Sequence, residues 1–207
     1  DRSSAASEVY KRQSLPHFLA GRTTVCVALT ELGAGSDFPA LETVARPDGK
    51  GWRLTGAKHL ITAAPQAELA QVFARIEGAP RGELSCFLVE MDADGVERGP
   101  VQQTIMADGQ TGGFALTDVF VGEDAVVGEP GGARALAVDW INWARTRRGG
   151  RASGRGRYCV EAATGYAHER EAYGRPIVEL GTVGAMLADM VIDLETIRAL
   201  SLELLGR

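Results

Sequence analysis

The sequence has no long apolar run: none of its hydrophobic stretches approaches the roughly 18 residues that a membrane-spanning helix needs. It has three cysteines, Cys26, Cys86 and Cys159, and three histidines, all isolated from one another. None of them has the spacing of a zinc site or of a disulfide framework, so we expect neither a metal nor a disulfide. Three thiols without a pattern favour a reducing compartment, and we expect a cytoplasmic protein.

An excess of positive charge is also missing. The 22 Lys and Arg against 27 Asp and Glu give a net charge of −5, which argues against nucleic acid as a general partner. Hydrophobic residues make up 45% of the chain and charged residues 24%, which is ordinary for a soluble globular protein. The 207 residues suffice for one large domain or two small ones.

No methionine opens the sequence, and residues 1–13 resemble a translated adapter used in DNA-library preparation. We expect this segment to be non-native and leave it out of the fold. The native part is then expected to begin at Ser14 and to be a fragment of a longer gene.

Short β-like runs separated by Gly, Pro and Asp fill the chain from about residue 23 to residue 121. Turns are expected at Asp48-Gly49 and Asp94-Gly95. Many short strands with turn signals between them predict a small barrel or sandwich. Examples of the expected strands are Thr24–Leu29, Trp52–Thr55, Val72–Ile76, Cys86–Glu90 and Phe114–Val121.

After Gly131-Gly132 the hydrophobic period becomes helical. One helix is expected from about Ala133 to Glu171, and a second from about Glu179 onward, with a proline turn between them. The predicted fold class is therefore α+β and multidomain, a small β-barrel followed by a long antiparallel helical hairpin. A stripe at steps of three and four indicates that the second helix packs on a neighbour; its members are Val183, Leu187, Met190, Leu194, Ile197 and Leu204.

Residues 30–37 (Thr-Glu-Leu-Gly-Ala-Gly-Ser-Asp) are the most informative segment of the chain. They place a hydroxyl at the end of the first expected strand, then a glycine turn, then a second hydroxyl. Glycine lets a backbone approach a ligand closely and allows positive φ. Successive N–H groups in such a turn can bind an anion.

Four segments, in this order, resemble the acyl-CoA dehydrogenase family: residues 30–37, the G-x-K-x-x-I-T of residues 56–62, residues 118–121 together with 126–129, and the R-x-x-Y-G-x-P of residues 170–176. The resemblance implies that residues 14–22 end a helical N-terminal domain and that residues 23–130 form a β-barrel middle domain that binds flavin and acyl-CoA. It further implies that residues 131–207 are the first helices of a C-terminal four-helix bundle, in a homo-oligomer, a dimer or tetramer.

The cofactor that the resemblance implies is FAD. Hydroxyl donors at the edge of its ring would raise its power to accept electrons. Ser36 would also contact acyl-CoA, and Leu60 stands where the family commonly has an aromatic residue, although alone it fits an ordinary strand core. The middle-domain residues assigned to FAD by resemblance are Val27, Leu29, Thr30, Gly35, Ser36, Leu60, Ile61 and Thr62.

The helical part carries four further residues by resemblance. Arg170 would reach the FAD phosphates of a neighbouring subunit, for which a guanidinium fork is suited, and Tyr173 would lie on the adenine side. Asn142 stands where the family often has an Asp that contacts substrate, and Arg145 where it has an arginine facing CoA. Gly181 replaces a family glutamine, which removes an amide contact near the adenine.

An arginine-rich run leaves three interpretations open: a solvated face or a face pairing between subunits, a site for CoA phosphates, or a site for nucleic acid. The glycines at 149, 150, 154 and 156 disfavour a rigid helix and indicate close packing or a local break. The arginines are Arg145, Arg147, Arg148, Arg151, Arg155 and Arg157.

The activity implied by the resemblance is α,β-dehydrogenation of an acyl-CoA thioester, with hydride passing to flavin N5 and a proton to a carboxylate base. The usual family base falls downstream of Arg207 and a second family placement falls on Ala144, so no catalytic residue is expected here and the fragment is expected to be inactive. Glu161 and Glu171 are expected to face solvent. A flavoprotein is a possible electron acceptor. The alternatives are a flavin oxidase or monooxygenase of the same family, or a non-catalytic flavoprotein associated with nucleic acid.

Overall fold

The computed structural model of the chain describes residues 16–104 and 110–205. The segment 1–13, expected to be non-native, lies outside the described residues. The structure divides into two compact units, the first ending at Ala137 and the second beginning at Val138. Each unit is described by itself. In the described ranges, no helix combines the length and apolar character needed to cross a membrane.

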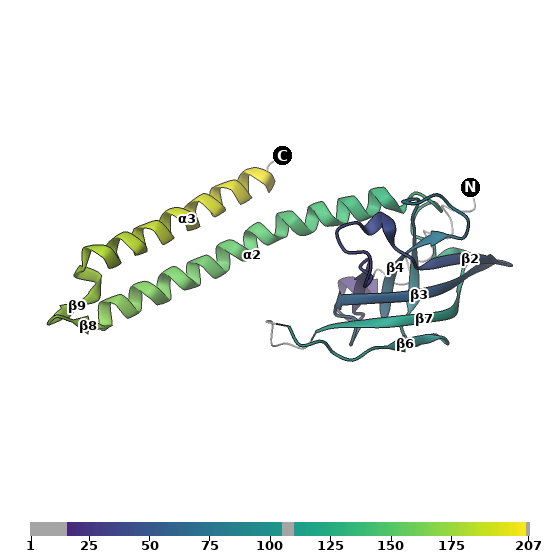
Figure 1. The fold of residues 1–207 in the computed structure, drawn as a ribbon, viewed down its shortest axis with the longest axis horizontal. Coiled ribbons are helices and arrows are strands. Elements are labelled where there is room, and N and C mark those ends of the chain that lie inside the picture. The colour runs from purple at the N-terminus through teal and green to yellow at the C-terminus, as the bar shows by residue number, and fades with distance from the viewer. Residues whose placement is uncertain (1–15, 105–109, 206–207) are drawn as a thin grey trace. The chain divides into compact units, whose positions relative to one another are not determined.

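The first unit is built on a sheet of seven strands that curls into a half-barrel (Figure 1). This confirms the small barrel predicted from the sequence. Hydrogen-bonded neighbours follow the order β1-β4-β2-β3-β7-β6, and β5 pairs with β4. β4 runs parallel to β1 and β2, and the other pairs are antiparallel. The strands are β1 (Val25–Ala28), β2 (Val44–Asp48), β3 (Gly51–Thr62), β4 (Leu69–Ile76), β5 (Ser85–Glu90), β6 (Val96–Arg98) and β7 (Thr111–Gly122).

Both predicted turns are present. Asp48 pairs with Gly51, so Gly49 and Lys50 form a two-residue hairpin loop, and Gly49 has a φ of 60°. Gly95 has a φ of 89° directly before β6. The strands named from the sequence do not include β2 or β6, and Trp52–Thr55 covers only four of the twelve residues of β3.

The core of this unit lies on one face of the curled sheet. Alternate residues of β4, β5 and β7 supply it, among them Val72, Phe87 and Leu116, all at most 2% exposed. Trp52 packs edge-on against Phe87 with ring centroids 5.6 Å apart. Apolar burial of this kind is the main favourable contribution to folding.

The second unit consists of two long helices joined by a small hairpin. α2 runs over Ala133–Glu169, of which the part from Val138 belongs to this unit, and α3 over Gly181–Leu205. Between them lie β8 (Glu171–Ala172) and β9 (Arg175–Pro176), which pair antiparallel. The predicted helical hairpin is therefore confirmed.

Small residues let the two helices approach closely. A Cβ at Gly149 would lie 3.1 Å from Ser201 Cβ, and one at Gly156 would lie 3.2 Å from Leu194 Cδ1. The close-packing interpretation is therefore correct at Gly149 and Gly156, whereas a Cβ at Gly150 or Gly154 would meet nothing within 4 Å. α2 is continuous through all four glycines, so the expected local break is wrong.

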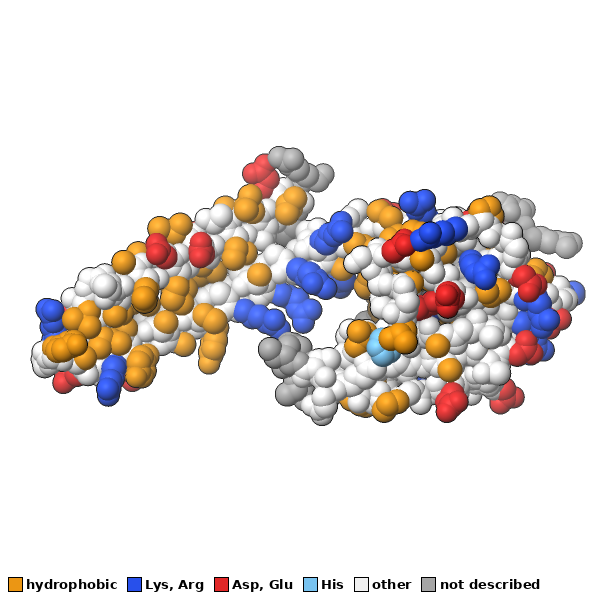
Figure 2. Space-filling view, viewed as in Figure 1, with side chains coloured by type: hydrophobic (Ala, Val, Ile, Leu, Met, Phe, Trp, Pro, Cys, Tyr) orange, Lys and Arg blue, Asp and Glu red, His pale blue; other side chains and the backbone are white. Residues whose placement is uncertain are grey.

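The predicted stripe on α3 is buried only in part. Val183, Leu187, Met190 and Leu194 are half-buried, whereas Leu204 is 62% exposed. Figure 2 shows orange apolar side chains spread over the surface of this helical pair.

Candidate functional site

The segment 30–37 makes a tight turn after β1. Glu31 and Ala34 exchange both main-chain hydrogen bonds, with N···O distances of 3.1 and 3.2 Å. Gly35 and Ser36 follow on the surface, and their N–H groups have no hydrogen-bond partner within the described part of the chain. These two donors are available to a ligand.

Gly33 and Gly35 do not use the conformational freedom of glycine. Neither has a positive φ, and a Cβ at either position would meet nothing within 4 Å. No described neighbour requires glycine at either position, and the missing side chains leave the main chain of this turn open to close approach.

The second predicted segment forms an irregular bend near the end of β3. The register between β3 and β7 shifts between Lys58 and Ile61, and Leu60 there has a φ of 55° and is 52% exposed. The left-handed conformation turns Leu60 out of the strand alternation. Its interpretation as ordinary strand core is therefore wrong, while Ile61 beside it is buried.

One main-chain hydrogen bond joins these two segments. The N–H of His59 donates to the carbonyl of Thr30 at 2.9 Å, which brings the end of β1 beside the bend in β3. Neither the Thr30 nor the Thr62 hydroxyl has a partner among the residues that the structure describes. Of the residues assigned to FAD by resemblance, Leu29 and Thr30 thus lie beside the bend that holds Leu60 and Ile61, and Thr62 follows as the last residue of β3.

Beneath this region lies a buried ion pair. Lys58 Nζ contacts Glu31 Oε1 at 2.7 Å, and the two residues are 2% and 8% exposed. Nζ also donates to the carbonyls of Phe73 at 2.7 Å and Leu29 at 3.4 Å. Three acceptors match the three donors of an ammonium group.

Glu31 also accepts hydrogen bonds from the two residues directly before β2. The N–H groups of Glu42 and Thr43 donate to its carboxylate at 2.5 and 3.1 Å, and the Thr43 hydroxyl at 2.5 Å. Burial opposes ionisation of Glu31, but the charge of Lys58 and these hydrogen bonds outweigh it and lower the pKa of the carboxyl. Burial lowers the pKa of Lys58 to about 8 against the opposing effect of Glu31. Both groups are therefore charged at pH 7.

Glu31 and Lys58 belong to the two family-like segments, but the sequence alone assigned neither of them a role. A signal was present: counting in steps of two from the apolar Leu54 puts Lys58 on the inward face of β3. A buried lysine requires a buried partner, and carboxylates are the usual ones.

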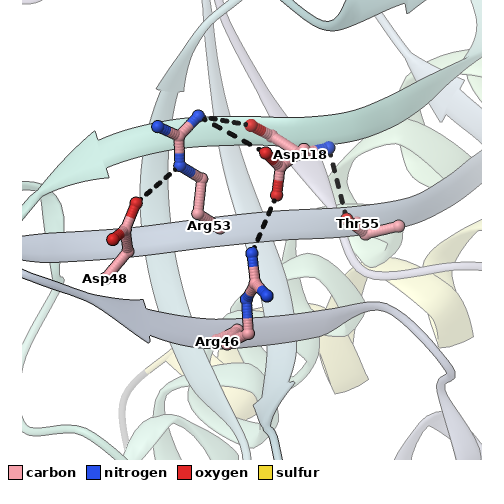
Figure 3. Close-up of polar contacts among 5 residues, drawn as sticks. All are labelled: Arg46, Asp48, Arg53, Thr55 and Asp118. Carbon is pink, nitrogen blue, oxygen red and sulfur yellow. Dashed lines mark hydrogen bonds and ion pairs between the residues drawn. The ribbon is translucent and has the colours of Figure 1, made fainter.

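A second polar cluster lies on the surface of the same sheet and is centred on Asp118 (Figure 3). Asp118 begins residues 118–121, which carry part of the family resemblance. Asp118, with a φ of 54°, accepts from Arg46 at 3.3 Å and lies 3.6 Å from Arg53 Nη1. Its N–H donates to the Thr55 hydroxyl at 3.2 Å, opposite an irregularity in β3. Arg53 also bonds Asp48 at 2.8 Å. The cluster joins β2, β3 and β7 and has no catalytic group.

In the second unit, the predicted substrate residues lie next to each other. Arg145 Nη1 donates to Asn142 Oδ1 at 3.3 Å, one helical turn away on the exposed face of α2. The amide therefore orients the guanidinium.

Arg170 and Tyr173 lie at the hairpin between the helices. Tyr173 has a φ of 55° and Gly174 one of 76°, which make the two-residue turn between β8 and β9. Tyr173 is 92% exposed. The turn itself requires positive φ at both central residues, which accounts for the left-handed conformation of the tyrosine.

The arginine-rich run is exposed along its whole length, and Figure 2 shows blue side chains gathered on α2. Arg157 lies 3.8 Å from Glu161 on the same helix, a pair exposed to solvent. Glu161 and Glu171 are exposed, as expected.

No described carboxylate has the environment of a general base. Glu31 is the one buried carboxylate in the described ranges, and its pKa is lowered, opposite to the change such a base needs. Burial raises the pKa of Cys26 to about 11 and that of Cys86 to about 12, so neither thiol is a nucleophile at neutral pH. Across residues 16–104 and 110–205, no group of His, Cys, Asp and Glu side chains could hold a metal ion.

Two family models match the chain. The acyl-CoA dehydrogenase middle domain matches residues 26–119, and the acyl-CoA dehydrogenase C-terminal domain matches residues 131–207. The chain belongs to the acyl-CoA dehydrogenase family. Members are flavoprotein oxidoreductases, and the half-barrel followed by two long packed helices is the fold expected of them.

Individual relatives agree with this assignment. Human mitochondrial short-chain specific acyl-CoA dehydrogenase is 33% identical over 197 residues, covering 94% of this chain and 48% of the relative. An acyl-CoA dehydrogenase of Bacillus anthracis complexed with FAD is 30% identical with a TM-score of 0.87, covering 92% of this chain and 33% of that one. The prolyl acyl carrier protein oxidase AnaB is 27% identical with a TM-score of 0.91, covering 95% and 53%. The chain thus spans about half the length of its curated relatives.

Proposed function

We propose that the end of β1 and the bend in β3 hold the isoalloxazine of FAD. The observation that carries this proposal is the 2.9 Å main-chain hydrogen bond from His59 to Thr30, which joins the two segments. Each segment has a threonine, Thr30 or Thr62, whose hydroxyl has no partner among the described residues. The FAD complex of the B. anthracis relative supports it.

The residues present fit such a ring. Thr30 and Thr62 offer O–H donors for its polar edge, and the exposed Leu60 offers an apolar contact. The open N–H groups of Gly35 and Ser36 suit a pyrophosphate. The left-handed conformation of Leu60, one of four described non-glycine residues with positive φ, turns this side chain outward, where it can meet the ring.

We assign the remaining roles on the same basis. Arg170 would hold the FAD phosphates of a neighbouring subunit in a homo-oligomer, and Tyr173 would lie at the adenine. Ser36, Asn142 and Arg145 would bind acyl-CoA. Arg145 would contact the phosphates or the pantetheine amides of the CoA. The exposed apolar side chains of α2 and α3 support burial against further helices or a second copy.

The proposed reaction is α,β-dehydrogenation of an acyl-CoA thioester. FAD, when bound, supplies the hydride acceptor. The residues of this chain bind and orient the ring and the thioester, and the proton goes to a carboxylate that we place outside residues 1–207. The human relative is named for short chains, so butyryl-CoA is the first substrate to test.

An oxidase is the second candidate, because the chain superposes on AnaB with a TM-score of 0.91. The two activities differ in the acceptor that reoxidises the flavin, which the half-barrel alone does not determine.

The test uses the full-length protein that contains this chain, loaded with FAD. We expect anaerobic addition of butyryl-CoA to bleach the flavin absorption. Slow recovery in air and fast recovery with an artificial electron acceptor would support a dehydrogenase, and fast recovery in air an oxidase. Bound FAD that neither butyryl-CoA nor palmitoyl-CoA bleaches would overturn the proposed reaction.

A further inference from the structure

We propose that Glu31 and Lys58 are positioning residues for the flavin: their buried ion pair holds the Thr30 segment and the Leu60–Thr62 bend at a fixed separation. The inference rests on the proposed FAD site and deepens it. Neither side chain touches the ring in this proposal, and each acts through the main chain beside it.

The pair lies where four strands meet. Lys58, on β3, donates to the carbonyl of Leu29 just after β1, to Glu31, and to the carbonyl of Phe73 in β4. Glu31 in turn accepts from residues 42 and 43, directly before β2. In the described chain no buried side-chain polar atom is left without a partner. A network satisfied in this way has one geometry.

Each member is one or two residues from a proposed flavin contact. Glu31 directly follows Thr30, and Lys58 precedes His59, whose N–H bonds the Thr30 carbonyl at 2.9 Å. Leu60 begins the irregular bend directly after His59. A displacement of either charged side chain therefore moves the ends of both segments that would face the ring.

Stability alone does not account for a pair of charges at this place. A buried ion pair replaced by well-packed apolar groups is often as stable or more so. Charge-assisted hydrogen bonds add directional constraint that apolar contacts lack. Because the pair lies beneath the two segments, this constraint fixes the separation of the Thr30 segment from the Leu60–Thr62 bend.

The experiment compares Glu31→Gln and Lys58→Met with Asp48→Asn, which breaks the exposed 2.8 Å pair with Arg53 on the same sheet. Circular dichroism is first used to find a temperature at which all variants are fully folded, so that a loss of stability does not affect the measured FAD binding. Three quantities are then measured: the Kd for FAD, the visible circular dichroism of bound FAD at saturation, and hydrogen exchange of the His59 amide.

We expect both core variants to weaken FAD binding by about tenfold or more, equivalent to one lost hydrogen bond. They should also change the visible band and speed His59 exchange, while Asp48→Asn changes none of these. Wild-type values in both folded core variants would overturn the positioning role and leave the FAD site standing. Absence of FAD binding by the folded wild type would instead overturn the proposed site itself.

Discussion

Gly56 leaves the space that Thr43 fills: a Cβ at residue 56 would lie 2.7 Å from the Thr43 Cα. Thr43 donates its hydroxyl and its N–H to Glu31, which bonds Lys58 two residues after Gly56. The glycine and the lysine of the G-x-K segment therefore serve one cluster. The two segments that carry most of the family resemblance are joined through Thr43.

Replacing Gly56 with alanine should lower the free energy of unfolding of the first unit by about 1–3 kcal/mol, because the methyl group forces the main chain at Thr43 to move. Urea unfolding monitored by tryptophan fluorescence measures it. Gly33→Ala is the matched control, since a Cβ there meets nothing within 4 Å, and its effect should stay within about 0.5 kcal/mol. Equal effects at the two positions would contradict this account.

Adjacent glycines in α2 should respond with opposite sign. Gly149→Ala places a methyl group against the Ser201 side chain and should destabilise the helical pair by about 1 kcal/mol. Gly150→Ala meets nothing within 4 Å and should stabilise it by about 0.5–1 kcal/mol through helix propensity. Thermal unfolding followed at the helical circular dichroism band compares them. Stabilisation by both substitutions would show that α3 does not pack on Gly149.

Acid should weaken the first unit partly through Glu31. The folded pKa of Glu31 lies below its ordinary value of 4.5, so the unfolded chain binds a proton first as the pH falls. The stabilisation is therefore complete above about pH 4.5 and is lost as the pH falls through the folded pKa.

Glu31→Gln removes this dependence and, at pH 7, should cost about 3–5 kcal/mol because Lys58 is left buried without a counter-charge. Urea unfolding between pH 3 and pH 7 measures both effects. A variant with the same slope as the wild type in the acid range would show that Glu31 is not the titrating group.

The Asp118 cluster should contribute little through its charges and more through its backbone. Asp118→Asn loses the ion pairs with Arg46 and Arg53, which are solvent-exposed, and should cost about 0.5–1 kcal/mol. Asp118→Val should cost at least about 1 kcal/mol more, since a β-branched residue tolerates a φ of 54° poorly. Chemical unfolding of the two variants side by side checks the order, and equal costs would contradict it.

Local patterns predicted most elements, and their failures have physical causes. The alternation in Phe114–Val121 and the spacing along α3 each depend on one face being buried, so they were visible in the sequence. β2 was not predicted because it contains Pro47, and proline usually argues against a strand. The proline is tolerated because β2 pairs with β4 only through Val44 and Ala45, so no pairing with β4 is lost at Pro47. β3 was predicted too short because Gly56 and the bend at Leu60 interrupt its alternation.

The candidate site was predictable only through resemblance. Glu31 and Lys58 are 27 positions apart, and nothing local indicates that their side chains meet. The exposure of Leu60 depends on a left-handed residue that strand periodicity does not reveal. Exposure was easier to predict than contact: Glu161 and Glu171 are solvent-facing as expected.

The most direct test of the central claim is a titration of the folded chain with FAD, followed by quenching of flavin fluorescence. The wild type and Thr117→Val, a matched change of an exposed threonine on β7, should bind alike. The double variant Thr30→Val/Thr62→Val should bind about tenfold or more weakly, because two hydroxyl donors to the ring are lost. Equal binding by the double variant, or no binding by a folded wild type, would contradict the claim that these two segments hold the flavin.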